Sequence, residues 1–351
     1  MATPTHLTCL CALIYEPASL LSSSALPFKC CICHCNTCRR TTGALGTWYA
    51  ILKGRPSDKS MSNTTAYKTS EKYTRFFCKQ CGCNVFVRSE RDGRWLACAG
   101  IVEIDDKQTE NGTRDEKNLN VAQVEFHEYV GDARDGGFAP YLTRLGGKNV
   151  PCFASEPDDG AGQMSEAELL ELKDQGRDTV SDERGEMMDV ACHCGGVQLH
   201  IAPPAHNEKS EGWYVPQDRS KYSARLCCCR SCRLTLGFSL QPWTYIPPAH
   251  IFTKQGELVL FGPRAKDTVQ IVKLKHYQSS DSVLRSFCST CGATVFFQSF
   301  ERPDVIDLSV GVVRSRADNA RVEEWLQWDR NEVSMRHEAV DCELVEAWLG
   351  G

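Results

Sequence analysis

Apolar and polar residues alternate in several short stretches of the chain. The alternation is unbroken from 306 to 312 and recurs from 197 to 201, and a two-residue period is typical of a half-buried strand. Short β-branched and aromatic runs occupy 85–87 and 295–297, which also favours strands. No long stretch shows the helical period of about 3.6 residues. The pattern therefore predicts a mainly β protein made of short strands.

A polar stretch rich in Asp, Glu and Gly runs from about 155 to 186 and separates two halves of the chain. Within it, Ser165 and Glu168 form a capping-box pattern ahead of three leucines, which predicts a short exposed helix. A second polar insertion, 105–118, is expected to form a long loop. We therefore predict two domains, residues 1–152 and 189–351, joined by a polar linker at 153–188.

The same series of cysteine motifs occurs once in each half. Its order is C-x-C, then C-x-C-x-x-C-R, then F-C-x-x-C-G. The motif cysteines are Cys9, Cys11, Cys33, Cys35, Cys38, Cys78 and Cys81 in the first half, and Cys192, Cys194, Cys227, Cys229, Cys232, Cys288 and Cys291 in the second. Repetition of fourteen cysteines in one order indicates a tandem duplication.

The cysteine content, 21 of 351 residues, suggests what stabilises such short strands. The cysteines cluster at separations of one and two residues, which favours metal chelation over disulfides and predicts a reducing compartment, the cytoplasm or the nucleus. The formal net charge is −5 and no basic tail is present, so nucleic acid is not an expected partner. No apolar run approaches the roughly 18 residues of a membrane helix, so no membrane is expected. Glu16 and Pro17 interrupt the apolar stretch 7–26, which we interpret as folded protein rather than a signal peptide.

Two closed zinc sites follow from the outer motifs. Zinc prefers about four ligands in a tetrahedral array. A C-x-x-C-G turn supplies two thiolates, and a C-x-C element supplies two more because alternate residues of a strand point to the same side. The predicted structural sites are Cys9, Cys11, Cys78 and Cys81, then Cys192, Cys194, Cys288 and Cys291. The histidines between motif cysteines, His34 and His193, are expected to point away from the metal.

The middle motif leaves one cysteine triplet in each half. The triplets are Cys33, Cys35 and Cys38, then Cys227, Cys229 and Cys232. Three protein ligands and one open position are typical of a catalytic zinc. A thiolate-rich zinc favours a thiol as its fourth ligand, and would hold it as a reactive thiolate. The alternative is that a neighbouring thiol, Cys30, Cys31 or Cys228, closes a triplet and makes that site purely structural.

These motifs, in this order, resemble those of the glutathione-dependent formaldehyde-activating enzyme family, which includes centromere protein V. The resemblance implies a β-tent fold of several small curled antiparallel sheets in each half. It also implies two zinc ions per domain, one structural and one at the triplet. The family's activity joins formaldehyde and glutathione, so the resemblance implies a carbon–sulfur lyase type of enzyme with a small thiol substrate. Glutathione carries two carboxylates, and the arginines beside the triplets, Arg39, Arg40, Arg230 and Arg233, are the candidates to bind them.

The sequence departs from the family pattern in three places. Ala12 follows the first C-x-C, where the second half has Gly195. Cys228 lies between the first two cysteines of the second triplet, where a histidine is usual. The interval from the triplet to the C-x-x-C-G turn is also longer in the second half. Two other functions remain open at this point: a zinc-stabilised protein-binding module without catalysis, and a redox or zinc-buffering protein.

Overall fold

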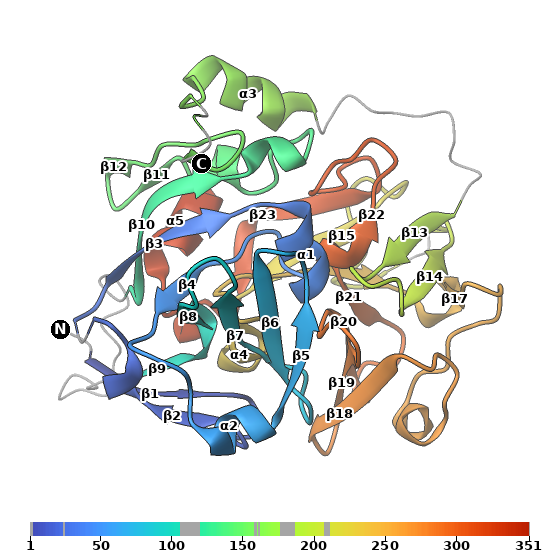
Figure 1. The fold of residues 1–351 in the computed structure, drawn as a ribbon. Coiled ribbons are helices and arrows are strands. Elements are labelled where there is room, and N and C mark those ends of the chain that lie inside the picture. Colours follow the sequence, from blue (N-terminus) through green and yellow to red (C-terminus); the bar gives the residue numbers. More distant parts are fainter. Residues whose placement is uncertain are drawn as a thin grey trace, which may run out of the picture.

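The computed structural model describes residues 3–23, 25–105, 120–157, 160, 162–175, 187–206 and 211–350. The first half contains β1 (Thr3–Thr8), β2 (Tyr15–Pro17), β3 (Phe28–Cys33), β4 (Tyr49–Ile51), β5 (Thr64–Lys68), β6 (Tyr73–Cys78), β7 (Asn84–Ser89), β8 (Trp95–Cys98), β9 (Val102–Asp105), β10 (Ala122–Glu128), β11 (Arg144–Leu145) and β12 (Lys148–Asn149). Two short helices, α1 (Asn36–Thr42) and α2 (Asp58–Ser62), lie between these strands, and α3 (Glu166–Gln175) follows them (Figure 1).

The second half repeats this series of strands. It contains β13 (Met188–Ala191), β14 (Gln198–Ile201), β15 (Tyr222–Cys227), β16 (Gln241–Ile246), β17 (Ile251–Thr253), β18 (Leu274–Ser280), β19 (Val283–Cys288), β20 (Thr294–Ser299), β21 (Ile306–Ser309), β22 (Val313–Arg314) and β23 (Leu326–Ser334). Helix α4 (Arg230–Leu236) follows β15, and α5 (Cys342–Gly350) ends the described chain. Short strands dominate both halves, so the prediction of a mainly β protein is confirmed.

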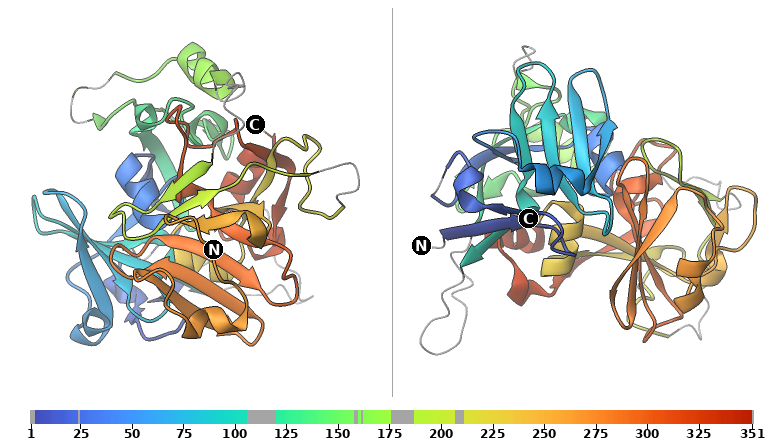
Figure 2. Two further views of the ribbon diagram at one scale, coloured as in Figure 1. Left: turned by 90° about the vertical axis from the view of Figure 1, so that its right-hand side faces the viewer. Right: turned by 60° about the horizontal axis from the view of Figure 1, so that its bottom comes forward.

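Strand order shows that the two halves are copies of one fold. The first half has a five-stranded sheet in the order β4-β8-β7-β6-β5, and the second half has β16-β21-β20-β19-β18 in the same relation. Each half also has a parallel pair, β3 with β10 and β15 with β23. The second pair extends its large sheet to seven strands, whereas β3 and β10 form a separate two-stranded sheet. A smaller sheet stands beside each large one, β2-β1-β9 in the first half and β17-β14-β13-β22 in the second. Figure 2 shows the two bodies, blue to cyan and yellow to red, side by side.

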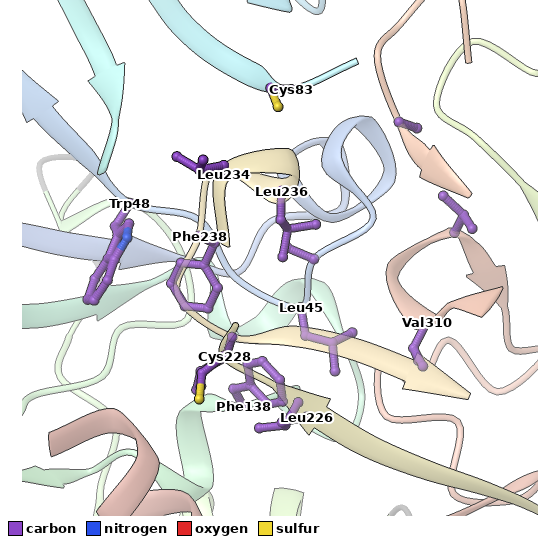
Figure 3. Close-up of a cluster of buried hydrophobic side chains, with 14 of the residues drawn as sticks. Leu45, Trp48, Cys83, Phe138, Leu226, Cys228, Leu234, Leu236, Phe238 and Val310 are labelled. Carbon is purple, nitrogen blue, oxygen red and sulfur yellow. The ribbon is translucent and has the colours of Figure 1, made fainter. Parts of the chain in front are cut away.

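The two halves share one hydrophobic core. Figure 3 shows Leu45 and Trp48 of the first half among Leu234 and Phe238 of the second. The rings of Trp48 and Phe238 meet edge to face with centroids 5.0 Å apart, and both side chains are buried. The halves are therefore joined by packing as well as by the chain between them.

Reciprocal hydrogen bonds join the halves around this core. The amide of Gly311 donates to the carbonyl of Gly43 over 3.0 Å, and the amide of Gly100 donates to the carbonyl of Gly237 over the same distance. Gly43 and Gly237 end α1 and α4 with φ values of 90° and 76°, a left-handed conformation that favours glycine. Each of these two helices therefore ends on a backbone contact with the other half.

Buried carboxylates cross between the halves in the same reciprocal way. Asp341 of the second half accepts hydrogen bonds from the amides of Val121 and Ala122, at 2.8 and 3.0 Å. Asp135 of the first half accepts from the amides of Ala320 and Arg321, at 2.9 and 2.7 Å. Each half thus supplies a carboxylate that satisfies backbone donors of the other.

Three further expectations can be compared with the structure. Helix α3 begins where the capping box predicted, and Ser165 and Glu168 exchange hydrogen bonds there. The expected loop at 105–118 lies almost wholly outside the described residues. The prediction of one strand from 306 to 312 is wrong beyond Ser309, because 310–312 turn into a 3-10 helix as Gly311 bonds to the other half. Among the described residues, no helix is long and apolar enough to cross a bilayer.

Candidate metal centres

The structure brings together the four sulfurs of the first predicted closed site. Cys9 and Cys11 follow β1, while Cys78 ends β6 and Cys81 lies in the turn to β7. Their Sγ atoms all lie within 4.8 Å of one another. Ala12 takes a φ of 59° in the turn after Cys11, so it adopts the left-handed conformation that Gly195 supplies in the second half. The departure at Ala12 therefore leaves the turn intact, at the cost of backbone strain.

The second closed site has the same construction. Cys192, Cys194, Cys288 and Cys291 lie within 4.8 Å of one another. Backbone amides donate to two of these sulfurs, from Val197 to Cys192 over 3.3 Å and from Gly196 to Cys194 over 3.4 Å. Such N–H···S bonds favour the thiolate form.

The donor chemistry of both closed groups fits zinc. The Sγ atoms of Cys194 and Cys288 are 3.5 Å apart, and those of Cys11 and Cys78 are 3.6 Å apart. These separations are too long for disulfides. They are close to the roughly 3.8 Å between thiolates that share a tetrahedral zinc. Four thiolates gathered in one largely buried group would need such a cation to balance their negative charge.

Each triplet lies where a strand passes into a helix. Cys33 ends β3, Cys35 caps the N-terminus of α1, and Cys38 lies in its first turn. The sulfur of Cys35 accepts the amide of Cys38 over 3.3 Å, which is the capping role usually taken by Ser or Asp. The equivalent bond in the second half, from the Cys232 amide to Cys229, measures 3.4 Å. One capping interaction therefore positions the last two thiols of each triplet.

Three thiols make up each triplet group in the described residues. The sulfurs of Cys33, Cys35 and Cys38 form one group within 4.8 Å, and those of Cys227, Cys229 and Cys232 form the other. No further Cys, His, Asp or Glu of the described chain belongs to either group. Each group therefore offers three ligands and leaves a fourth position for another donor.

The neighbouring thiols and histidines have other partners. The sulfur of Cys228 points into the core, where it donates to the carbonyls of Ser334 and Met335 over 3.4 and 3.3 Å (Figure 3). Cys30 is buried in the hydrophobic core, and Cys31 lies outside the triplet group. His34 forms a hydrogen bond of 2.9 Å with His127. His193 bonds to Tyr67 over 2.8 Å. None of them closes a triplet group.

Two buried arginines beside the triplets were missed in the sequence. Arg75 donates to the sulfur of Cys38 over 3.0 Å, and Arg285 approaches the sulfur of Cys232 at 3.7 and 3.8 Å. Each lies three residues before the first cysteine of its C-x-x-C-G turn, so the repeated motif extends to R-x-F-C-x-x-C-G. That extension was the signal that could have identified them.

The thiol facing each arginine is the most acidic of its triplet. Hydrogen bonds from Cys33 and Cys35, aided by the positive charge of Arg75, hold the pKa of Cys38 well below its usual value. In the second half, Cys227 and Cys229 lower the pKa of Cys232 in the same way, with Arg285 as the nearby cation. Both arginines therefore compensate thiolate charge inside the protein.

The arginines proposed from the sequence to bind carboxylates are engaged by the protein itself. Arg233 is buried and donates to the carbonyls of Gly100 and Val102 and to the carboxylate of Glu103. Arg230 is exposed and pairs with the same Glu103 at 2.6 Å. These contacts place both side chains at the interface between the halves.

In the first half, Arg39 is buried and donates to Asn36 over 2.6 Å. Arg40 is half-buried, and its carbonyl accepts the amide of His193 over 2.9 Å. Substrate binding by these four arginines stays a prediction.

A cavity of about 460 Å³ opens at the second triplet. Cys227, Cys229 and Cys232 line it together with Arg285. A molecule in this cavity would therefore reach both the triplet sulfurs and the guanidinium that faces them. The size falls within the range of roughly 300–1,000 Å³ that is usual for small-molecule sites.

Comparisons with known proteins agree with the repeated motifs. The sequence profile described as glutathione-dependent formaldehyde-activating enzyme matches the chain twice, at residues 4–116 and 214–328. No curated protein matches the sequence. A crystal structure of a Rhodobacter sphaeroides protein is 20% identical, covers 40% of this chain and 100% of its own, and has a TM-score of 0.25. Because the two profile matches together span more than half of the residues, the chain belongs to the glutathione-dependent formaldehyde-activating enzyme family and carries its domain twice.

Proposed function

We propose that the protein is a zinc-dependent enzyme of the carbon–sulfur lyase type that acts on glutathione or another thiol adduct similar to S-hydroxymethylglutathione. The observation that carries the proposal is the pair of three-thiol groups, each without a fourth protein ligand among the described residues. Zinc bound there would hold the sulfur of a substrate thiol as a thiolate. Four zinc ions per chain are proposed, two structural and two at the triplets.

The reaction proposed for each triplet is the addition of a thiol to formaldehyde. The sulfur of the thiol bonds to the carbon of formaldehyde, the carbonyl π bond breaks, and the thiol proton ends on the new hydroxyl oxygen. Arg75 and Arg285 would stabilise the negative charge that gathers on sulfur before the bond forms, because their guanidinium groups are buried and already face the triplet. The triplet itself would orient the sulfur toward the aldehyde.

Zinc content tests this proposal most directly. The purified full chain, with thiols kept reduced, is expected to hold four zinc ions by elemental analysis. Cys35→Ser and Cys229→Ser should each remove one, whereas the control Cys152→Ala should remove none because Cys152 lies outside all four groups. Formation of S-hydroxymethylglutathione, followed by NMR, should fall in Cys35→Ser and stay unchanged in Cys152→Ala.

Other zinc counts would favour other functions. A content of two zinc ions that is unchanged by Cys35→Ser would show that the triplets are not loaded, and the non-catalytic binding module would then be favoured. A content near zero would remove the basis for any zinc-dependent function. Four zinc ions without thiol binding would also contradict the enzymatic proposal.

A further inference from the structure

Four aromatic side chains line the cavity at the second triplet. The lining includes Trp213, Trp243, Tyr245 and Phe297. Trp213 and Tyr245 meet edge to face with centroids 4.6 Å apart, and the rings of Trp243 and Phe297 are 6.2 Å apart. Trp213 is 51% exposed, so about half of this large apolar side chain remains accessible.

The two arginines that line this cavity already have partners within the protein. Arg302 pairs with the buried carboxylate of Asp307 at 2.8 Å. Its guanidinium also lies over the rings of Trp213 and Phe297, at 5.4 and 5.3 Å from their centroids. Arg285 faces the Cys232 sulfur and the ring of Phe297. The pocket therefore offers ring surface rather than a free positive charge that would attract the carboxylates of glutathione.

Strand register shows that part of this aromatic wall belongs to the second half alone. Tyr245 pairs with Asp307 in β16 and β21, and the equivalent pair in the first half is Ile51 with Leu96. The cavity wall thus has Tyr245 where the first half has an aliphatic side chain.

Strand β20 also has an aromatic residue where the equivalent strand of the first half, β7, has an aliphatic one. Phe297 stands opposite Arg285, and the equivalent residue opposite Arg75 is Val87. At the entrance, Ser334 stands opposite Cys227, where the first half places the carboxyl group of Glu128 opposite Cys33. Two sites with the same triplet are therefore surrounded by different chemistry.

We infer that the second triplet takes thiols, or their adducts, whose body carries an aromatic ring close to the sulfur, and that Trp213 is a specificity-determining residue. This inference rests on the proposed function, because it assumes that the triplet binds the sulfur. The ring packs against Trp213 and Tyr245 while the sulfur reaches the triplet. The two halves then act on different substrates of one reaction type.

Calorimetry on the zinc-loaded full chain tests this inference, with Cys35→Ser in the background to remove the first triplet. The probes are 2-phenylethanethiol, 2-mercaptoethanol and 2-phenylethanol. We expect 2-phenylethanethiol to bind about tenfold more tightly than 2-mercaptoethanol, the effect of roughly one aromatic pair. Trp213→Ala should abolish most of this difference and leave the binding of 2-mercaptoethanol unchanged. Quenching of tryptophan fluorescence by the aromatic thiol should be lost in the same variant.

A matched control and a second variant make the result decisive. Tyr15→Ala removes another exposed aromatic side chain, 57% accessible on β2, and should change nothing. Tyr245→Ile installs the residue of the first half and should weaken binding of the aromatic thiol as Trp213→Ala does.

The possible failures separate the inference from the proposed function. Equal affinity for the two thiols, or no effect of Trp213→Ala, would overturn the inference and leave the proposed function standing. Equal affinity for 2-phenylethanol and 2-phenylethanethiol would overturn it too, because the ring would then bind without the sulfur. Binding of neither thiol to the zinc-loaded chain would contradict the proposed function itself.

Discussion

At the scale of single residues, the sites depend on groups that surround the cysteines. The thiols define where metal can bind, but the buried guanidinium groups of Arg75 and Arg285 determine how much negative charge each triplet can hold. Arg75 also donates to the hydroxyl of Tyr49, so its orientation is fixed by two partners. Groups of this kind commonly change metal affinity by about 10–100-fold when removed.

Arg75→Met should therefore weaken zinc at the first triplet alone. Methionine keeps the length and the apolar packing of the side chain but cannot donate to Cys38. We expect about a tenfold loss of affinity for one zinc ion, measured by competition with a chromophoric chelator. Arg91→Met, which changes an exposed arginine, is the control. An unchanged affinity would show that Arg75 does not stabilise the triplet.

Cys81 and Cys83 provide a test of which thiols belong to a closed site. Both are fully buried and their sulfurs are 3.4 Å apart, but only Cys81 belongs to the four-thiol group. The second half has Ala293 at the position equivalent to Cys83. Cys81→Ala should lose one zinc ion and unfold at a lower temperature, whereas Cys83→Ala should retain its zinc. Zinc analysis with thermal unfolding measures both, and zinc loss from Cys83→Ala would contradict the assignment.

At the scale of elements, the strand-to-helix junctions build the triplets and also join the halves. Helices α1 and α4 each begin on a capping cysteine and end on a left-handed glycine that contacts the other half. A Cβ atom on Gly43 would lie 2.5 Å from the hydroxyl of Ser309 and 2.6 Å from the carbonyl of Thr294. The helix that positions the triplet is therefore also an interface element.

Gly43→Ala should destabilise the protein more than the same change at a glycine with open surroundings. Gly93 has a similar φ of 73° but nothing within 4 Å of the added Cβ atom. In both variants, backbone strain should lower the free energy of unfolding by roughly 1–2 kcal/mol. Gly43→Ala should lose about 1–3 kcal/mol more through overlap with the second half. Urea unfolding compares the two, and equal losses would argue against a tight contact.

The sequence predicted best those features that depend on residues close together in the chain. The cysteine groups could be predicted because each combines a short turn with a neighbouring strand end. Helices α1 and α4 were missed because seven residues do not establish a helical period, and Cys35 does not resemble a usual N-cap. The strand predicted to continue past Ser309 stops because of Gly43, which is 266 residues away in the chain. No local pattern carries that information.

At the scale of the whole molecule, the two halves satisfy each other's buried donors. Asp341 of the second half accepts hydrogen bonds from amides of the first, and Asp135 of the first half accepts them from amides of the second. The carbonyls of the two glycines that end α1 and α4 accept amides of the opposite half in the same reciprocal way. The rings of Phe77 and Phe287, which precede the two C-x-x-C-G turns, meet edge to face with centroids 6.2 Å apart. The sequence predicted the duplication but not this reciprocity, because a repeat shows what the halves share and not how they face one another.

Asp341 should make the stability of the assembled halves depend on pH. Burial raises the pKa of Asp341 to about 7 in the folded protein, against roughly 3.9 in an unfolded chain. The folded state therefore binds the proton more tightly between these values, and its stability falls as pH rises through that window. Relative to Asp341→Asn, the free energy of unfolding of the native chain should fall by about 2 kcal/mol between pH 5.5 and pH 8.

Urea unfolding of both proteins at several pH values measures this difference, and zinc release that is common to both cancels in the comparison. The matched position Asp135 provides the control, because Asp135→Asn removes a crossing carboxylate at the other end of the interface. A constant difference between native protein and Asp341→Asn across the range would show that Asp341 keeps one protonation state.

The crossing hydrogen bonds also have a consequence for how this protein can change over generations. In an assembly of two identical chains, every substitution appears at both sites at once, so one site cannot be altered without the other. Here the partner is part of the same gene, and a substitution at Tyr245 leaves Ile51 untouched. The covalent duplication retains the mutual support of a symmetric pair and frees each site to acquire its own substrate.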